Sequence, residues 1–452
     1  MVFSSATFVL LFLPLVYFIT RALPLKAQNI VLLIASLVFY AWGEPVYVFL
    51  MLASCLVNYG LALIPKTRSK LALWMAAIYN IGMLGVFKYA DFFIENINAL
   101  LQTSIPLPRL ALPIGISFYT FQALSYVIDV HRGKVAPTKN FLHVLLYIAF
   151  FPQLIAGPIV IYKDIAPMIT DREMTWAGGA EGLARFIVGL SKKLLIANTA
   201  AVAVDRLYAQ TAFGTGAAWL MAFAYMIQIY FDFSGYSDMA IGMGTMFGFR
   251  FKENFRHPYA AESIQDFWRR WHISLSNWFK EYVYIPLGGN RRGKGREILN
   301  KWIVFTLTGL WHGAAWTFLI WGWFHGTFLT LEATVLKPKR WPRWVRHVYA
   351  LVVIAVGFVI FRAESIVQAG AVLKAMFVPT ADTLDNSAVI RTFMSPLSIV
   401  LMAVAVAACI PRTRWSSSKK PALKYTCAAV LWVICLLNLA TTSYNPFIYF
   451  RF

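Results

Sequence analysis

The feature that most constrains this chain is the run of residues 302–331, which contains no Asp, Glu, Lys or Arg. Its only ionisable side chains are His312 and His325. An imidazole in hydrocarbon must be desolvated and hydrogen-bonded, so it is costly to keep without a function or a partner. His312 lies between Gly309 and Gly313, on a helical face where another helix or a substrate can approach the backbone closely. His312 is therefore our first candidate for a catalytic residue, and the alternative is a hydrogen-bonded packing residue.

The composition predicts that such apolar runs recur along the chain. Hydrophobic residues make up 59% of the sequence and charged residues 13%, about half of the charged share of soluble domains. We therefore expect an all-α polytopic membrane protein in which residues 1–452 form a single membrane-embedded domain. The net charge of +21 comes from Lys and Arg in short loops, which is the orientation bias of membrane proteins and argues against nucleic acid as a partner. The four cysteines lack metal-ligand spacing, so we expect no metal.

Most of the apolar runs are long enough, or nearly so, to cross a hydrocarbon core of about 30 Å. Alternating basic loops place the amino terminus outside and the carboxy-terminal tail, residues 441–452, on the extracytoplasmic side. We expect segments in or across the membrane near residues 6–20, 28–43, 46–64, 71–88, 112–130, 141–161, 348–362, 395–411 and 425–440.

Two further apolar segments carry charges. Residues 182–204 include Arg185 and Lys193, so this segment either lies in the interface or packs inside the bundle. The run 216–247 is interrupted by a polar stretch that contains Asp232 and Asp238, and such carboxylates seldom face lipid. They are either helix-capping and packing residues or part of a polar patch along the path of the acceptor or donor.

Residues 249–301 are basic, aromatic and too polar to span a membrane, so we expect an interfacial or re-entrant element there. Residues 266–278 have the pattern of one amphipathic helix, with Trp271 and Leu275 on one face and His272 on another. The glycine-rich basic loop 288–296 either attracts phosphates or simply orients the protein in the membrane.

Two motifs carry a resemblance to a known family. The pairing of FWRRWH at residues 267–272 with LWHG at 310–313 resembles the bacterial branch of the membrane-bound O-acyltransferase family. Residues 1–5, 112–119 and 230–239 are similar to its alginate O-acetylase and peptidoglycan O-acetyltransferase type, and the match runs from residue 1 to about residue 335. The resemblance implies a bundle of about eleven membrane helices with re-entrant helices and a central funnel, in the bacterial cytoplasmic (inner) membrane.

The resemblance also implies the chemistry. The acyl donor, commonly acetyl-CoA, reaches the site from the cytoplasm, and the acetyl group passes outward to a partner acetyltransferase that modifies alginate, peptidoglycan or cellulose. The essential histidine maps to His312 and the second to His272, whose alternative is an interface anchor among tryptophans. Transfer from a thioester needs a base for the accepting hydroxyl and stabilisation of the oxyanion. Further candidates for orienting the base or binding the donor are Arg269, Arg270, Asn277 and Trp311, while we expect His325 to be a packing residue.

The carboxy-terminal tail suggests a second hypothesis. Residues 447–452 resemble the aromatic terminal motif of a small membrane partner in D-alanylation systems, whose tyrosine accepts an acyl group. By this resemblance Tyr449 takes the acetyl group near His312 and relays it outward. The alternative for Tyr449 is an aromatic anchor at the membrane interface.

A non-enzymatic transporter or flippase for an acylated or lipid-linked substrate is the alternative function. Intramembrane histidines and interrupted helices also line transport paths. Against this class, the sequence has no clear inverted repeat, and both histidine motifs lie in one half of the chain.

Overall fold

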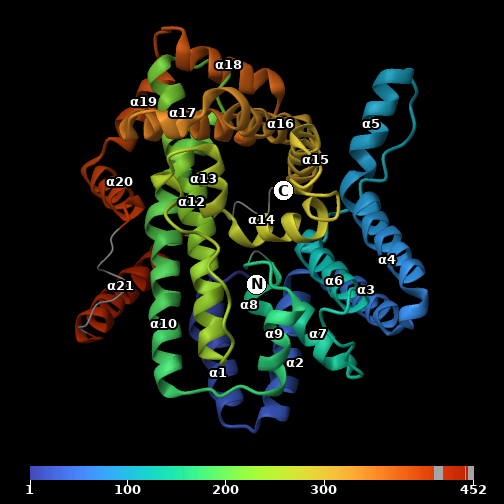
Figure 1. Cartoon of the computed structure of the whole chain (residues 1–452). Coiled ribbons are helices and arrows are strands. Elements are labelled where there is room, and N and C mark those ends of the chain that lie inside the picture. The colour runs from blue at the N-terminus through green and yellow to red at the C-terminus, as the bar shows by residue number, and fades with distance from the viewer. Residues whose placement is uncertain (156, 412–420, 443, 446–452) are drawn as a thin grey trace. The chain divides into compact units, whose positions relative to one another are not determined.

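The computed structural model describes residues 1–452 except 156, 412–420, 443 and 446–452. Within the described part of the chain, helices of several kinds are joined by turns and loops, and there is no β-strand (Figure 1). The all-α expectation is therefore confirmed. The chain divides into two compact units, residues Met1–Phe186 with Tyr236–Lys252, and Ile187–Gly235 with Glu253–Phe452.

The first unit is built from the amino-terminal helices. Its core contains tilted and edge-on phenylalanine rings, for example Phe8 against Phe3, Phe39 and Phe151. Its helices are η1 Phe8–Phe12, α1 Leu13–Arg21, α2 Leu25–Gly43, α3 Tyr47–Leu63, α4 Ser69–Leu84, α5 Ala90–Leu101, α6 Ile116–His131, α7 Phe141–Ala149, α8 Phe151–Leu154 and α9 Tyr162–Thr170.

The second unit holds both histidine motifs. Two long helices, α10 Trp176–Ser191 and α12 Thr215–Met246, contribute residues to both units. The remaining helices of the second unit include η4 Lys192–Ala197, α11 Asn198–Tyr208, η5 Pro258–Ala260, α13 Ile264–Arg270, α14 Ile273–Phe279, η6 Lys280–Tyr284, α15 Lys294–His312, α16 Trp316–Leu331, α17 Arg343–Arg362, α18 Ile366–Phe377, α19 Leu384–Phe393, α20 Pro396–Cys409 and α21 Pro421–Thr441.

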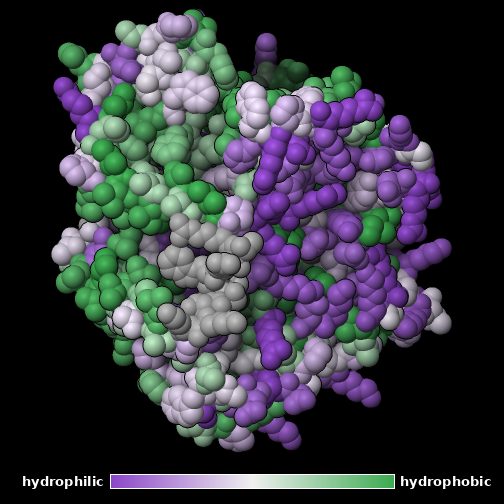
Figure 2. Space-filling model, turned by 60° about the vertical axis from the view of Figure 1, so that its left-hand side comes forward, coloured by the Kyte–Doolittle hydropathy of each residue, from purple (hydrophilic) through white to green (hydrophobic). Residues whose placement is uncertain are grey.

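Several helices have the length and apolar character of membrane spans. Five segments of the described chain qualify, and the pair α19 and α20, bent by 70°, makes a sixth if it is counted as one span. Figure 2 shows wide surface areas of hydrophobic side chains, as a chain that faces lipid requires. The chain is therefore a multi-pass membrane protein, and the expected count of about eleven spans stays a prediction. The five spans are Leu25–Gly43, Lys66–Leu101, Trp176–Tyr208, Arg343–Arg362 and Pro421–Thr441.

The polar stretch within 216–247 does not interrupt the helix, because α12 is one continuous helix of 32 residues. The two aspartates do not break it, since each is neutralised by a cation. Asp232 Oδ1 lies 2.9 Å from Lys193 Nζ, with both side chains at most 3% exposed. Asp238 Oδ1 likewise lies 2.9 Å from a guanidinium nitrogen of Arg185. The charges of segments 182–204 and 216–247 thus pair with each other, which favours the packing interpretation of the aspartates.

The single amphipathic helix expected over 266–278 is wrong. The structure has two short helices, α13 and α14, separated at Trp271 and His272. His272 has a left-handed backbone, with φ of 43°. Asn254 makes this break possible, because its main-chain carbonyl accepts from Ile273 N and its side-chain Oδ1 accepts from Ser274 N at 3.1 Å. Backbone donors left open at the start of α14 are therefore satisfied by a residue distant in sequence.

Candidate functional site

His312 lies at the last residue of α15, where residues 313–315 separate α15 from α16. The two helices come so close that backbone atoms of each one meet a glycine of the other. A Cβ atom at Gly309 would come within 2.4 Å of Phe318 O, and one at Gly322 within 2.3 Å of Phe305 O. The expectation that glycine at 309 permits close approach is confirmed, and the element that approaches is α16.

The imidazole of His312 is surrounded by aromatic rings and only 6% of the residue is exposed. Trp321 of α16 and Phe361 of α17 each lie edge-on to it, with ring centroids 5.1 Å away. The adjacent Trp311 ring is 5.0 Å away. This environment excludes bulk water, which strengthens any electrostatic interaction that the imidazole makes with a substrate.

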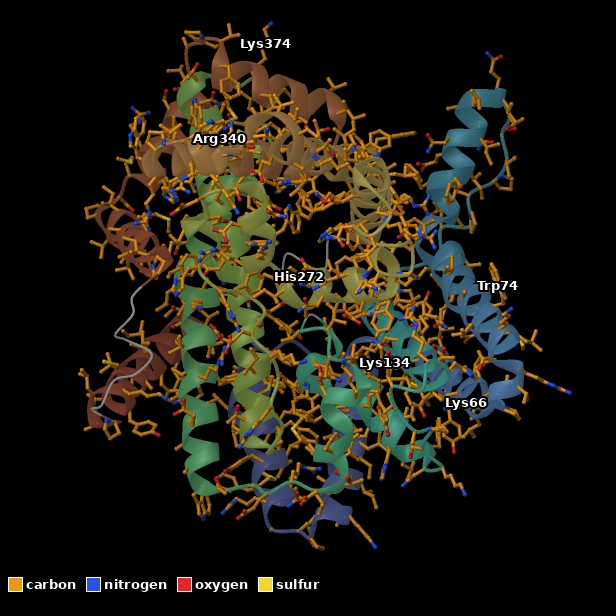
Figure 3. The ribbon with its side chains drawn as sticks, viewed as in Figure 1. Lys66, Trp74, Lys134, His272, Arg340 and Lys374 are labelled. Atoms are coloured by element: carbon orange, nitrogen blue, oxygen red, sulfur yellow. The ribbon has the colours of Figure 1, made fainter. Side chains whose placement is uncertain are left out.

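His272 lies in the interior of the second unit, at the start of α14 (Figure 3). It is 1% exposed, and burial lowers the pKa of its imidazole to about 3, so the ring is neutral. Its ring centroid lies 5.9 Å from that of Trp311. Trp311 therefore contacts both histidines, so the structure brings together the two motifs that lie forty residues apart in the sequence.

Asn254 determines which nitrogen of His272 carries the proton. Its Oδ1 accepts from the backbone N–H of Ser274, so this atom is an oxygen and can only accept. His272 Nδ1 lies 3.3 Å from the same oxygen and must therefore donate to it. The proton is held on Nδ1, and Nε2 presents a lone pair that has no hydrogen-bond partner among the described residues. Sequence reasoning missed Asn254, because no local pattern links it to a histidine eighteen residues later.

The two neighbouring arginines of the first motif lie in different places. Arg269 is exposed and lines a pocket of about 220 Å³ between α13, α14, α15 and α16. Arg270 bonds through Nε to Asp266 at 3.0 Å and instead lines a larger groove beside α17. The side chains of successive residues in a helix point in directions about 100° apart. The placement of Arg269 and Arg270 therefore does not support a joint role in binding the donor.

The Arg269 pocket has a basic rim and an aromatic wall. Lys280 and Lys301 line it together with Arg269, and Trp268 and Phe305 supply the wall. Thr308 of α15 also lines it, one helical turn before His312. The pocket therefore extends from three cations, of which Lys301 pairs with Glu297 at 2.6 Å, toward the helical turn that ends in His312. Sequence reasoning missed the two lysines, because Lys280 of η6 and Lys301 of α15 line the same pocket only after these elements have folded together.

The other candidates are placed as follows. Asn277, a candidate for orienting the base or binding the donor, is exposed on α14, whereas both histidines are buried. His325 is 1% exposed among aromatic rings, and a Cβ at Gly357 would come within 2.8 Å of its Nε2, which agrees with a packing role. The described residues contain no group of three or more His, Cys, Asp or Glu able to hold a metal ion.

The start of the carboxy-terminal tail is attached to the second unit. The Tyr444 hydroxyl donates to Asp205 Oδ2 at 2.6 Å, and Arg362 donates to the other oxygen of the same carboxylate at 2.9 Å. Arg362 directly follows Phe361, whose ring contacts His312. Tyr449 lies outside the described residues.

Comparison with known proteins places the same region in one family. A family model described as membrane-bound O-acyltransferase matches residues 134–367, which contain both histidines. The chain is 38% identical to the "probable alginate O-acetylase AlgI" of Pseudomonas putida, over the full length of both. It is 35% identical to the peptidoglycan O-acetyltransferase of Helicobacter pylori, covering all of this chain and 98% of that protein. A teichoic acid D-alanyltransferase of Bacillus subtilis is 26% identical over 56% of this chain and 69% of its own.

The glycine contact between α15 and α16 generates a prediction about stability. We expect Gly309→Ala to lower the free energy of unfolding by about 1–3 kcal/mol, because the added methyl forces two backbones apart. Gly295→Ala is the matched control, since it lies in the same helix with nothing within 4 Å of its Cβ position. It should leave stability unchanged or slightly raised. Thermal unfolding in detergent measures both, and equal effects would contradict the tight contact.

Proposed function

Because this chain belongs to the membrane-bound O-acyltransferase family, we propose that it moves an acetyl group from a cytoplasmic thioester across the bilayer for O-acetylation of an extracytoplasmic polysaccharide. The chain is an acyltransferase by its family. Its relatives named for alginate and peptidoglycan support a polysaccharide acceptor, and alginate, peptidoglycan and cellulose are the candidates. We propose acetyl-CoA as the donor, a second acetyltransferase as the receiving partner, and the inner membrane as the location.

The observation that carries this proposal is the placement of His312. It is buried among aromatic rings, one helical turn beyond a pocket whose rim carries Arg269, Lys280 and Lys301. Phosphates of a nucleotide-linked thioester fit such a rim, because clustered cations bind phosphate oxygens strongly. A pantetheine arm entering from the rim would bring its thioester toward Thr308 and His312.

The proposed reaction needs one base. The His312 imidazole accepts the proton of the acceptor hydroxyl while the oxygen attacks the thioester carbonyl carbon. The C–S bond then breaks, and the proton passes from His312 to the departing thiolate. His272 Nε2 carries a lone pair in the same aromatic environment, so it is suited to accept a hydrogen bond from a donor of the bound substrates other than the reacting hydroxyl, and thereby to hold them in place. Both histidines are regenerated in the neutral form.

The role of His312 is tested by removing its base. We expect His312→Gln to reduce acetyl transfer from labelled acetyl-CoA in detergent by about 10²- to 10⁴-fold, the usual contribution of a positioned base. His325→Gln is the matched control, because His325 is equally buried and also contacts Trp321, with ring centroids 5.2 Å apart. It should retain activity within a few fold once folded protein is quantified by thermal unfolding.

The same assay separates the enzyme from the transporter or flippase. Equal turnover in wild type and His312→Gln would exclude His312 as the base. No turnover of acetyl-CoA by the wild type, together with translocation of a lipid-linked substrate in proteoliposomes, would favour the non-enzymatic alternative.

The role of Asn254 is tested by a change in kcat. We expect Asn254→Ala to lower kcat by about ten- to hundredfold, because His272 loses the acceptor that fixes its tautomer, while KM for acetyl-CoA changes little. Ser274→Ala is the control, since it removes only the hydroxyl that donates to the same Asn254 oxygen at 2.8 Å. An Asn254→Ala variant with wild-type kcat and only a lower unfolding temperature would reduce Asn254 to a structural residue.

We also propose that Tyr449 relays the acetyl group as an ester on its phenolic oxygen. The attachment of Tyr444 to Asp205 supports this, because five residues of extended chain reach about 17 Å beyond that anchor. Mass spectrometry after incubation with labelled acetyl-CoA should find an acetyl adduct on the wild-type tail and none in Tyr449→Phe. Tyr425→Phe on α21 is the control and should keep the adduct. A wild-type tail without adduct, with full activity in Tyr449→Phe, would leave Tyr449 as an interface anchor.

A further inference from the structure

A large groove of the second unit lies away from His272 and His312. It has a volume of about 930 Å³ and runs between α12, α17 and α20. Neither His272 nor His312 lines it. Its walls are apolar, and they include Phe223 and Met226 of α12, Leu351, Val352 and Ala355 of α17, and Val406 and Cys409 of α20.

The groove is open to the side rather than enclosed. Several of its wall residues keep more than a third of their surface exposed, among them Phe223 at 40%, Val352 at 37% and Val406 at 45%. In a membrane protein these exposed side chains, on helices that cross or approach the bilayer, face hydrocarbon rather than water. The groove is therefore accessible to molecules of the bilayer itself.

The polar groups of the groove gather at one end. Arg343 and His347 lie in the first two turns of α17, whereas Leu351, Val352 and Ala355 follow in the next turns. Arg270 and Glu262, from the segment that leads through α13, complete this end. The groove is thus amphipathic along its length, with charges at the beginning of α17 and hydrocarbon-like walls beyond.

The charged end has an excess of cations. Glu262 pairs with both Arg343, at 2.8 Å, and Arg346, at 3.0 Å. Arg270 pairs with Asp266. Three guanidinium groups thus meet two carboxylates, and the Arg343 side chain is 84% exposed, so much of it remains accessible to another anion. A basic pocket at the end of an apolar intramembrane groove has the charge pattern that recognises a lipid phosphate.

We propose that this groove is a binding site for an anionic phospholipid, whose acyl chains lie against α12, α17 and α20 and whose phosphate contacts Arg343 and its neighbours. A free phosphate ion would contact only the charged end, whereas a phospholipid contacts both the charged end and the apolar walls. The volume is at the upper end of the range for ligand sites, about 300–1,000 Å³, and suits a molecule with long hydrocarbon chains.

The test is native mass spectrometry of the full chain in detergent, titrated with phosphatidylglycerol or with phosphatidylcholine of the same acyl chains. We expect the wild type to bind phosphatidylglycerol at least about fivefold more tightly than phosphatidylcholine, because one accessible guanidinium near a lipid phosphate favours the anion by about that factor. Binding of the two lipids with equal affinity would overturn the proposal.

Two matched pairs of variants locate the site. Val352→Trp fills the groove and should lower phosphatidylglycerol affinity about tenfold, while Val348→Trp, exposed one turn earlier on α17 but outside the groove, should not. Arg343→Gln should remove most of the preference for the anionic lipid. Lys374→Gln on α18 (Figure 3) removes one positive charge outside the groove and should keep that preference. Equal effects within either pair would overturn the assignment.

Acetyl transfer distinguishes the lipid from an acyl donor in the same groove. Saturating acetyl-CoA should not displace bound phosphatidylglycerol from the wild type, because we place the donor in the Arg269 pocket. Competition between acetyl-CoA and phosphatidylglycerol, together with loss of acetyl transfer in Val352→Trp, would assign the groove to the donor and overturn the lipid site. The failure of the lipid site would leave the proposed role of His312 untouched.

Discussion

The backbone contact between α15 and α16 is the constraint on which the candidate site depends. Two helices can approach this closely only where one of them has no Cβ atom at the point of contact. Gly309 of α15 and Gly322 of α16 are the residues without a Cβ atom, one on each side of the contact. The contact turns the apolar run into a helical hairpin and fixes His312 near its turn. Trp321, one residue before Gly322, is thereby brought edge-on to the imidazole. The same glycines that allow packing therefore build the water-poor environment of the histidine.

Charges inside the apolar helices are accommodated by a second device, pairing between segments. Lys193 and Asp232 are each expensive alone in a low-dielectric environment, and removing one partner leaves a buried uncompensated charge. Together they allow α12 to remain continuous. One turn further along α12, Gly235 packs closely against α10. A Cβ atom at this position would lie only 2.7 Å from the carbonyl oxygen of Gly189. The polar and small residues therefore fit within one continuous helix, because each charge is paired and each glycine allows close packing.

Sequence reasoning located the membrane helices better than it located the site. Expected segments such as 28–43 and 395–411 correspond to α2 Leu25–Gly43 and α20 Pro396–Cys409, because hydropathy is summed over many residues and tolerates local error. The break at His272 was not predicted, because it depends on hydrogen bonds from Asn254, eighteen residues away. The spacing of apolar residues within a segment cannot show that a distant side chain will accept hydrogen bonds from the backbone of that segment. The pairing of His272 with His312 came from motif resemblance, and the structure gives it a physical basis in their shared contact with Trp311.

The tautomer of His272 limits how the two histidines divide the chemistry. Asn254 holds the proton of His272 on Nδ1, so Nε2 is able to accept a hydrogen bond. Burial disfavours the charged form of the ring, so His272 is poorly suited to hold a full positive charge. It cannot donate from Nε2 to a developing oxyanion. Stabilisation of that oxyanion must therefore come from other donors, and the side-chain hydroxyl of Thr308, which lines the pocket and bonds to Val304 O at 2.8 Å, is engaged with its own helix.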